Sequence, residues 1–201
     1  MHLTMSLEKD GKNVFYNEND PSKLSDTAHK FTAGLLKYTP DMACFTNPTV
    51  NSYKRFIPGY EAPCYISWSS SNRSALIRIP SSRGKSTRVE LRSPDPACNP
   101  YLTIAACLAA GLDGIEKNMT PPAEITDNIF EMSSEEREEK NIGNLPGSLH
   151  EAIAEFENDE VIKEALGDHI VTQYIAGKNR ECEEYNTRVS SWEIEKYIFS
   201  Y

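Results

Sequence analysis

The chain has 201 residues, of which 39% are hydrophobic and 25% are charged, as is typical of one globular domain or of one large piece of a bigger protein. No apolar run approaches the length of a membrane-spanning helix, and the first residues resemble neither a signal peptide nor a transit peptide. The net charge of −9 argues against non-specific nucleic-acid binding by the whole molecule.

The cysteines predict a reducing compartment, and therefore a cytoplasmic location. Their number is odd, their spacing is wide, and no C-x-x-C motif occurs, which argues against a disulfide framework and against a zinc ribbon. We therefore expect free thiols at Cys44, Cys64, Cys98, Cys107 and Cys182.

The first element pair is predicted to be a β-hairpin. Residues 2–7 alternate between polar and apolar, and this period of two is typical of a half-buried strand. Residues 8–13 contain an Asp-Gly turn signal, and residues 14–16 are predicted to form the returning strand. The polar side of the first strand carries His2, Thr4 and Ser6.

A helix is predicted to begin after Ser25, which is a suitable N-cap for the apolar residues that follow at helical spacing. The pattern ends at residues 38–40, where Pro40 is expected to stop the helix. Residues 41–52 form no regular pattern, and Asn47-Pro48 signals a turn within them.

The central part of the chain is predicted to form strands at residues 64–68, 74–79 and 88–92. Because short loops join these strands, we expect them to be antiparallel, since parallel crossovers need a dozen or more residues. The last strand should turn Val89 and Leu91 to one side and Arg88, Glu90 and Arg92 to the other.

Helices are predicted to follow the strands. Asn99-Pro100 begins one in the preferred way, and residues 101–112 are apolar nearly all round, so we expect this helix to be buried on most faces. From residue 123 the composition changes to Glu-rich helices, and residues 192–201 form an aromatic tail that we expect to dock within the molecule or on another subunit. We expect sheet and core helices over residues 1–122 and a helical C-terminal subregion over residues 123–201.

An island of positive charge lies at residues 54–92. This segment has eight Lys and Arg residues and two acidic residues, so it carries +6 in a chain of net charge −9. The simplest interpretation is a site for phosphate or carboxylate, which arginine grips in bidentate fashion. The alternative is scattered surface charge. The arginines on predicted strands and loops are Arg55, Arg73, Arg78, Arg88 and Arg92.

Three other residues have both a structural and a functional interpretation. Glu90 either neutralises its arginine neighbours or serves as an oxygen ligand for a divalent metal beside a polyphosphate. Glu61 is either a solvated loop carboxylate or a base on a loop that closes over a site. His2 is either a structural hydrogen-bonding residue or a metal ligand.

Several long segments resemble class I glutamine synthetase. They are NPTVNSYKRFIPGYEAP at residues 47–63, NRSALIRIP at 72–80, RVELRSPDPACNPYL at 88–102, AAGLDGI at 109–115 and MHLTMSL at the start. The similarity covers essentially the whole chain. It implies the C-terminal part of the catalytic domain, entered within a strand, as expected for a fragment. The implied fold is α+β, with an antiparallel sheet packed by helices as in the glutamine synthetase and guanidino kinase folds.

The resemblance also implies an activity and roles for the residues. The family makes glutamine from glutamate, ammonia and ATP through γ-glutamyl phosphate, with Mg²⁺ or Mn²⁺. It implies metal ligation by His2 and Glu90, glutamate binding by Arg55 and Arg92, and neutralisation of the transferring phosphoryl group by Arg73. Arg78, Arg88, Arg73 and Ser6 would lie on the nucleotide side, and Glu61 would be the flap carboxylate that binds glutamate and takes a proton from ammonium.

The chain departs from the family pattern at two positions. Thr4 stands where relatives often have a second His. Phe130 stands where adenylylated members have Tyr, so that control should be absent, as in the alpha-like subtype. The resemblance also implies a homododecamer and further metal ligands before Met1, and we therefore expect the 201 residues alone to be inactive.

Three alternatives stay open. The chain could belong to a relative that ligates glutamate to an amine or a polyamine. It could be a non-catalytic module of the same family, although retention of the charged site residues speaks against this. A basic patch for nucleic acid is disfavoured by the acidic remainder of the chain.

Overall fold

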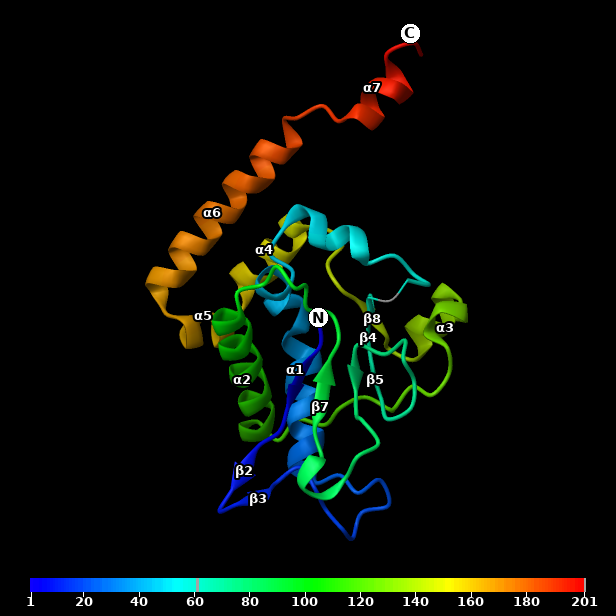
Figure 1. Cartoon of the computed structure of the whole chain (residues 1–201), viewed down its shortest axis with the longest axis vertical. Helices are drawn as coiled ribbons and strands as arrows, with labels where there is room; N and C mark the ends of the chain where they lie inside the picture. Colours follow the sequence, from blue (N-terminus) through cyan, green and yellow to red (C-terminus); the bar gives the residue numbers. More distant parts are fainter. Residues whose placement is uncertain (61, 201) are drawn as a thin grey trace.

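The computed structural model describes residues 1–60 and 62–200, and it has the expected α+β fold (Figure 1). Two long helices, α1 (Asp26–Thr46) and α2 (Pro100–Glu116), pack together beside a small sheet. The main core is shared by helix and strand side chains, and fully buried examples are Phe31, Leu35, Ile77, Val89 and Leu91. None of the described helices is both long and apolar enough to cross a membrane.

The main sheet has four short strands in the order β1-β7-β6-β5. They are β1 (Leu3–Met5), β7 (Val89–Leu91), β6 (Ile77–Arg78) and β5 (Trp68–Ser69). The β1–β7 and β7–β6 pairs are antiparallel, as expected, but β5 and β6 are parallel. The prediction was wrong for this pair because the crossover rule applies to full-length strands, whereas two-residue strands need only a short returning loop.

The N-terminal hairpin differs from the predicted one, because it forms within residues 8–13, which were expected to be the turn, and the first strand pairs with β7 instead. Its strands are β2 (Glu8–Lys9) and β3 (Lys12–Asn13), and Asp10 and Gly11 between them both have positive φ, as a two-residue primed turn requires. Residues 14–16 are not a strand as predicted. Val14 N instead donates to Leu7 O at 3.0 Å, and Tyr16 forms an isolated bridge with Leu24.

Helix α1 begins as predicted and ends later than predicted. The Ser25 hydroxyl caps it by accepting from Ala28 N at 3.1 Å. The helix continues through Pro40 to Thr46, although an interior proline costs about 3 kcal/mol. Residues beyond Pro40 such as Met42 and Phe45 are completely buried, and this packing outweighs the lost hydrogen bond. A 3₁₀ helix, η1 (Val50–Arg55), then occupies the segment for which no pattern was recognised.

Helix α2 has the predicted N-terminus, with the Asn99 side chain accepting from Tyr101 N at 2.9 Å. The expectation that it is buried on most faces is wrong. One stripe stays exposed, and its accessible fractions are 83% for Tyr101, 51% for Ile104, 42% for Leu108 and 39% for Leu112. Hydrophobicity alone could not separate this stripe from the buried face, because both are made of apolar residues.

The second half of the chain is mainly helical. It contains η3 (Ile129–Glu131), α3 (Ser134–Glu139), β8 (Gly143–Asn144), α4 (Leu149–Asn158), α5 (Glu160–Leu166), α6 (Asp168–Asn186) and α7 (Ser191–Tyr197). Strand β8 pairs with β4 (Tyr65–Ile66) beside the main sheet. Helices α6 and α7 extend beyond the body to the C-terminus (Figure 1). A third 3₁₀ helix, η2 (Gly84–Ser86), lies between β6 and β7 in the chain.

Candidate active site

The register of the sheet places the predicted site residues on one face. In the antiparallel β1–β7 pair Thr4 lies opposite Glu90, and in the β6–β7 pair Arg78 lies opposite Glu90. Directly opposite residues share a face of the sheet, so these three side chains form a row across three strands. The same register, continued by one residue at each end, places His2 beside Arg92 and Ser6 beside Arg88.

Glu90 is the centre of this arrangement. It is only 5% exposed, yet its carboxylate contacts three basic groups. Arg78 donates to both of its oxygens, from Nη2 to Oε2 at 2.7 Å and from Nε to Oε1 at 3.3 Å. His2 Nδ1 lies 3.2 Å from Oε1, and Arg92 Nε lies 3.5 Å from the same oxygen.

These neighbours set the charge states. Burial alone would raise the pKa of Glu90, but the hydrogen bond and charge of Arg78, with His2 and Arg92, outweigh it and lower the pKa. Burial and the charge of Arg92 lower the pKa of His2, which favours the neutral imidazole. An ionised carboxylate thus lies beside a neutral imidazole, which is the protonation state that metal ligation requires.

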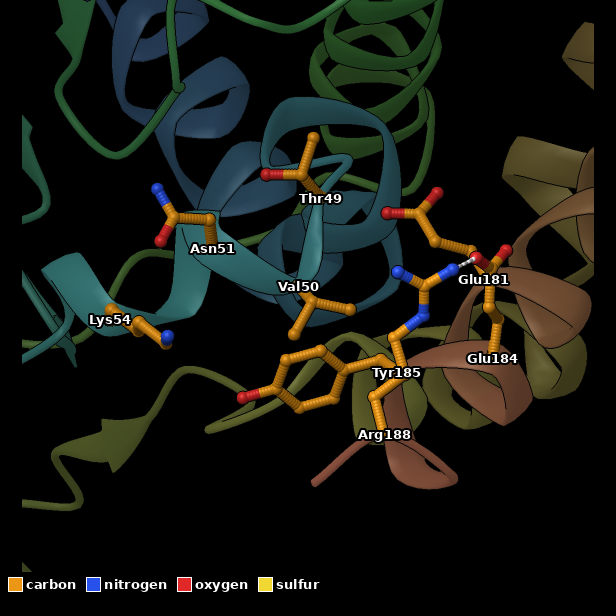
Figure 2. Close-up of a pocket in the computed structure, with 8 residues that line it drawn as sticks. All are labelled: Thr49, Val50, Asn51, Lys54, Glu181, Glu184, Tyr185 and Arg188. Carbon is orange, nitrogen blue, oxygen red and sulfur yellow. Dashed lines mark hydrogen bonds and ion pairs between the residues drawn. The ribbon is translucent and has the colours of Figure 1, made fainter. Parts of the chain in front are cut away.

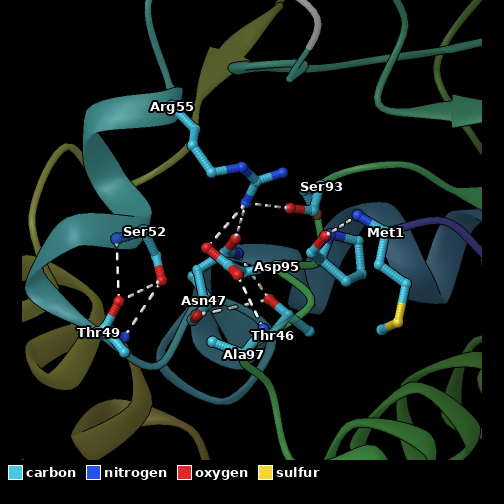
Figure 3. A network of polar contacts seen from close by, with 11 residues as sticks. Met1, Thr46, Asn47, Thr49, Ser52, Arg55, Ser93, Asp95 and Ala97 are labelled. Atoms are coloured by element: carbon cyan, nitrogen blue, oxygen red, sulfur yellow. Dashed lines mark hydrogen bonds and ion pairs between the residues drawn. The ribbon is translucent and has the colours of Figure 1, made fainter.

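Arg55 is held in a second polar network (Figure 3). Its Nη1 donates to Asn47 Oδ1 at 3.1 Å, to Ser93 O at 3.4 Å and to Asp95 Oδ2 at 3.4 Å. Ala97 N in turn donates to the other Asp95 oxygen at 2.8 Å. These contacts all use one terminal nitrogen, and they fix the direction of the guanidinium at the end of η1.

Two pockets that share lining residues collect four of the nine predicted site residues. Both are lined by His2, Tyr60 and Arg92. The first, of about 430 Å³, is also lined by Arg55, and the second, of about 490 Å³, by Arg73. Residues predicted from separate segments of the chain therefore line two pockets that have His2, Tyr60 and Arg92 in common.

The remaining predicted residues lie elsewhere. Ser6, Arg78, Arg88 and Glu90 line neither pocket, and Arg88 Nη1 donates to Ser86 O at 2.9 Å. By the register of the strands, these four residues belong to one face of the sheet. Glu61, predicted as the flap carboxylate, lies outside the described residues.

A divalent metal would find two ligands here. His2 Nδ1 and Glu90 Oε1 are 3.2 Å apart, close to the separation of about 3 Å between neighbouring ligands of an octahedral Mg²⁺. Among the described residues, no group of three or more His, Cys, Asp or Glu side chains is placed to hold a metal. The imidazole and the carboxylate therefore fit part of a metal site, and the other ligands would have to come from outside these residues.

The pockets also contain residues that were not recognised as site residues from the sequence. Tyr60 lines both pockets, and Asn72, Asn128 and Phe130 line the one that contains Arg73. From the sequence, Phe130 indicated only that the tyrosine hydroxyl of adenylylated members is absent. Asn72 directly precedes Arg73 in the segment NRSALIRIP, and this position beside a predicted site residue could have indicated that Asn72 lies at the site. Asn128 carried none, because its approach to Arg73 depends on the fold.

A separate hollow of about 410 Å³ lies between η1 and α6 (Figure 2). Lys54 lies on one of its walls with the ammonium 5.9 Å from the Tyr185 ring, and Arg188 is paired with Glu184 on another. Its charges are mixed, and none of the predicted site residues lines it. Lys54 thus belongs to the charge island in sequence but not to the site in space.

Comparison with known proteins agrees with this geometry. The family "Glutamine synthetase, catalytic domain" matches residues 1–197. A glutamine synthetase of Clostridium saccharobutylicum is 56% identical over 201 residues, and one of Thermotoga maritima is 54% identical over 199 residues. These alignments include 100% and 99% of this chain but only 45% of each relative.

Solved structures give the same result for the fold. A structure described as apo GmaS without ligand has a TM-score of 0.85 at 34% identity, over 98% of this chain and 44% of that one. A GmaS/ADP complex has a TM-score of 0.86 at 33% identity, over 98% of this chain and 45% of that one. The match over residues 1–197, together with the row of charged residues on the sheet, leads to one conclusion: the chain belongs to the glutamine synthetase family, within its catalytic domain.

Proposed function

We propose that this chain supplies the phosphate-binding and glutamate-binding part of a glutamine synthetase active site, which ligates ammonia to glutamate with ATP through γ-glutamyl phosphate. The observation that carries the proposal is the buried Glu90 carboxylate held among Arg78, Arg92 and His2, of which Arg92 and His2 line both pockets. The chain spans about 45% of the relatives it matches, so the rest of the active site would come from residues beyond these 201.

Each arginine has a role that follows from its position. Arg55 and Arg92 line the first pocket, where two guanidinium groups suit the carboxylate of glutamate. Arg73 lines the second pocket and would neutralise charge on the transferring phosphoryl group. Arg78 and Arg88, with Ser6, would contact the nucleotide along the same face of the sheet. The GmaS/ADP structure, with a similar fold, supports a nucleotide site.

His2 and Glu90 would hold a Mg²⁺ or Mn²⁺ ion. When bound, such an ion draws negative charge from the ATP phosphates and polarises them for transfer. The chain's own contribution is to present a neutral imidazole and an ionised carboxylate. Arg78 now occupies both oxygens of Glu90, so its fork would have to move aside, which would free it to contact phosphate.

The remaining parts of the proposal rest on the family resemblance. Glu61 would be the lid carboxylate that binds glutamate and takes the proton from ammonium, and the lid would protect an acyl phosphate from water. The whole protein would be a cytoplasmic homododecamer of the alpha-like subtype, without adenylylation at Phe130.

A hybrid enzyme tests the proposed function. This chain replaces the matching 45% of the Clostridium saccharobutylicum glutamine synthetase, and ATP-dependent glutamine formation is measured. We expect activity in the hybrid and no activity in the isolated 201 residues. Arg73→Ala should lower kcat at least about a hundredfold, as loss of a charge that stabilises a transition state does. A folded hybrid without activity, or an active isolated chain, would contradict the proposal.

Ligation of glutamate to another amine is the second candidate. It is favoured by the solved structures of GmaS, which are not described as glutamine synthetases and which match this chain with TM-scores of 0.85 and 0.86 at 33–34% identity. The same hybrid separates the candidates when ammonium competes with methylamine and putrescine for glutamate. Preferred incorporation of an amine would favour the second candidate, and glutamine as the main product would favour the first.

A further inference from the structure

The loop that carries Arg73 is braced from the side of β7. Arg92 Nη1 donates to Arg73 O, and it also donates to Ala75 O at 3.2 Å. The Arg73 side chain is exposed and lines the second pocket. Within the described part of the chain, its guanidinium makes no hydrogen bond or ion pair. The position of this cation is therefore set by the backbone of its loop and not by side-chain partners.

The Asn72 side chain braces the same loop from the other side, and it uses both ends of its amide. Its Oδ1 accepts from Ser74 N at 2.9 Å and from Ser74 Oγ at 2.7 Å, which closes the backbone around Arg73. Its Nδ2 donates to Asp127 O and, at 3.5 Å, to Ile125 O. One side chain thus joins the Arg73 loop to a segment about fifty residues further along the chain.

Two more contacts strengthen this connection. Ser74 Oγ accepts from Ile129 N at 3.4 Å. At the start of the loop, Glu124 Oε1 accepts from Ser70 N at 2.6 Å and from Ser69 Oγ at 3.1 Å. Residues 124–129 therefore support the loop along its length. Asn128, within this segment, and Phe130, directly after it, line the pocket that Arg73 faces.

We propose that Asn72 is a positioning residue for Arg73: by joining the Arg73 loop to the segment 125–129, it holds the guanidinium where a phosphoryl group must be neutralised. This inference rests on the proposed function, which assigns the phosphoryl contact to Arg73. An exposed cation stabilises transferred charge best when its position is fixed before the substrate arrives. The amide provides this because it donates and accepts at once, whereas alanine does neither and aspartate only accepts.

Magnesium-ATP binding by the hybrid enzyme, in which the rest of the active site is present, tests the inference by calorimetry. Arg73→Ala and Asn72→Ala should each weaken ATP binding at least about fivefold, the loss expected for one charge-assisted contact. Asn72→Asp should weaken it similarly, because the carboxylate keeps the acceptor for Ser74 but cannot donate to the two carbonyl groups. Ser71→Ala is the matched control in the same loop, and it should change the affinity less than about twofold, since its hydroxyl makes no described contact.

A double-mutant cycle distinguishes positioning from a general weakening of the structure. If Asn72 acts through Arg73, adding Asn72→Ala to Arg73→Ala should change ATP affinity less than about twofold. Additive losses, or an effect of Asn72→Ala equal to that of Ser71→Ala, would overturn the inference. Hydrogen exchange at Ile129 N should rise in both Asn72 variants. If the alanine variant fails to fold, the aspartate variant of nearly equal volume carries the comparison.

Failure of the proposed function would look different. A hybrid with the wild-type chain that binds no ATP, or an Arg73→Ala hybrid that binds it normally, would remove the nucleotide role on which this inference depends. Normal wild-type binding with a loss only in Arg73→Ala would leave the proposed function standing and refute the role of Asn72.

Discussion

At the scale of single residues, the site depends on a carboxylate that is buried and yet ionised. Glu90 keeps its charge because three basic groups surround it, and the bidentate contact with Arg78 is the shortest of them. Removing one partner of such a buried group leaves the others unpaired, which is far more destabilising than losing a surface ion pair.

Asp41 offers a residue-scale prediction on pH. Burial, followed by the nearby Asp159 and Glu155, raises the pKa of Asp41 to about 7. Because the folded pKa lies above the unfolded value, the folded chain binds the extra proton, and the free energy of unfolding falls as pH rises from about 4 through about 7. Asp41→Asn should therefore stabilise the chain at pH 8 by about 1 kcal/mol, after allowance for solvent screening, and have little effect at pH 4.

Urea unfolding at the two pH values checks this expectation. Glu164→Gln, on the exposed side of α5, controls for the loss of one negative charge and should leave the difference between the two pH values unchanged. Equal stabilisation by Asp41→Asn at pH 4 and pH 8 would show that the charge of Asp41 is not the cause.

The sequence indicated charged candidate residues better than the residues that support them. His2, Arg55, Arg73 and Arg92 were identified from charge and motif, and the fold brings them to two pockets that share lining residues. The amide of Asn72 was missed because its partners are backbone carbonyls some fifty residues away, which no local pattern reveals.

At the scale of elements, helices α1 and α2 meet through glycine. A Cβ on Gly114 would lie 2.3 Å from Lys30 O, and one on Gly34 would lie 2.1 Å from Ala110 O. These glycines are needed for close approach of the two backbones, and a methyl group at either position must push the helices apart.

Gly114→Ala should therefore lower the free energy of unfolding by about 2 kcal/mol or more, even though alanine is the better helix former. Gly177→Ala in α6 is the matched control, because no atom lies within 4 Å of its new methyl group. That change should stabilise the chain by up to about 1 kcal/mol. Denaturant unfolding measures both variants, and a neutral Gly114→Ala would contradict the close packing.

The element types were more predictable than their limits. Caps at Ser25 and Asn99 fixed the starts of α1 and α2, because capping is a local property of the chain. The end of α1 was misplaced because burial of Met42 and Phe45 outweighs the local effect of Pro40. Such tertiary packing cannot be read from a single helix sequence.

At the scale of the whole molecule, the C-terminal segment stands apart from the body. Residues 183–200 are exposed throughout, and in Figure 1 helix α7 lies at the far end of the molecule from the β2–β3 hairpin. Trp192 is 61% exposed and packs against Tyr197 within the same helix, with ring centroids 5.7 Å apart. Docking of this tail on another subunit stays a prediction.

Deleting residues 190–201 should change the free energy of unfolding by less than about 0.5 kcal/mol, because no described side chain in this segment is buried. Thermal and urea unfolding of the shortened chain at low concentration check this. A clearly lower stability would mean that the tail packs on the body. A change only at high concentration would indicate contact between copies.

We propose that Glu90 and its neighbours form the metal and phosphate part of a ligase site. Titration of the hybrid enzyme with ATP, with and without Mn²⁺, tests this role. We expect Mn²⁺ to strengthen ATP binding to the wild type, and Glu90→Gln to abolish that gain, whereas Glu139→Gln on exposed α3 should retain it. A Glu90→Gln variant that binds ATP with the same Mn²⁺ dependence as the wild type would contradict the account.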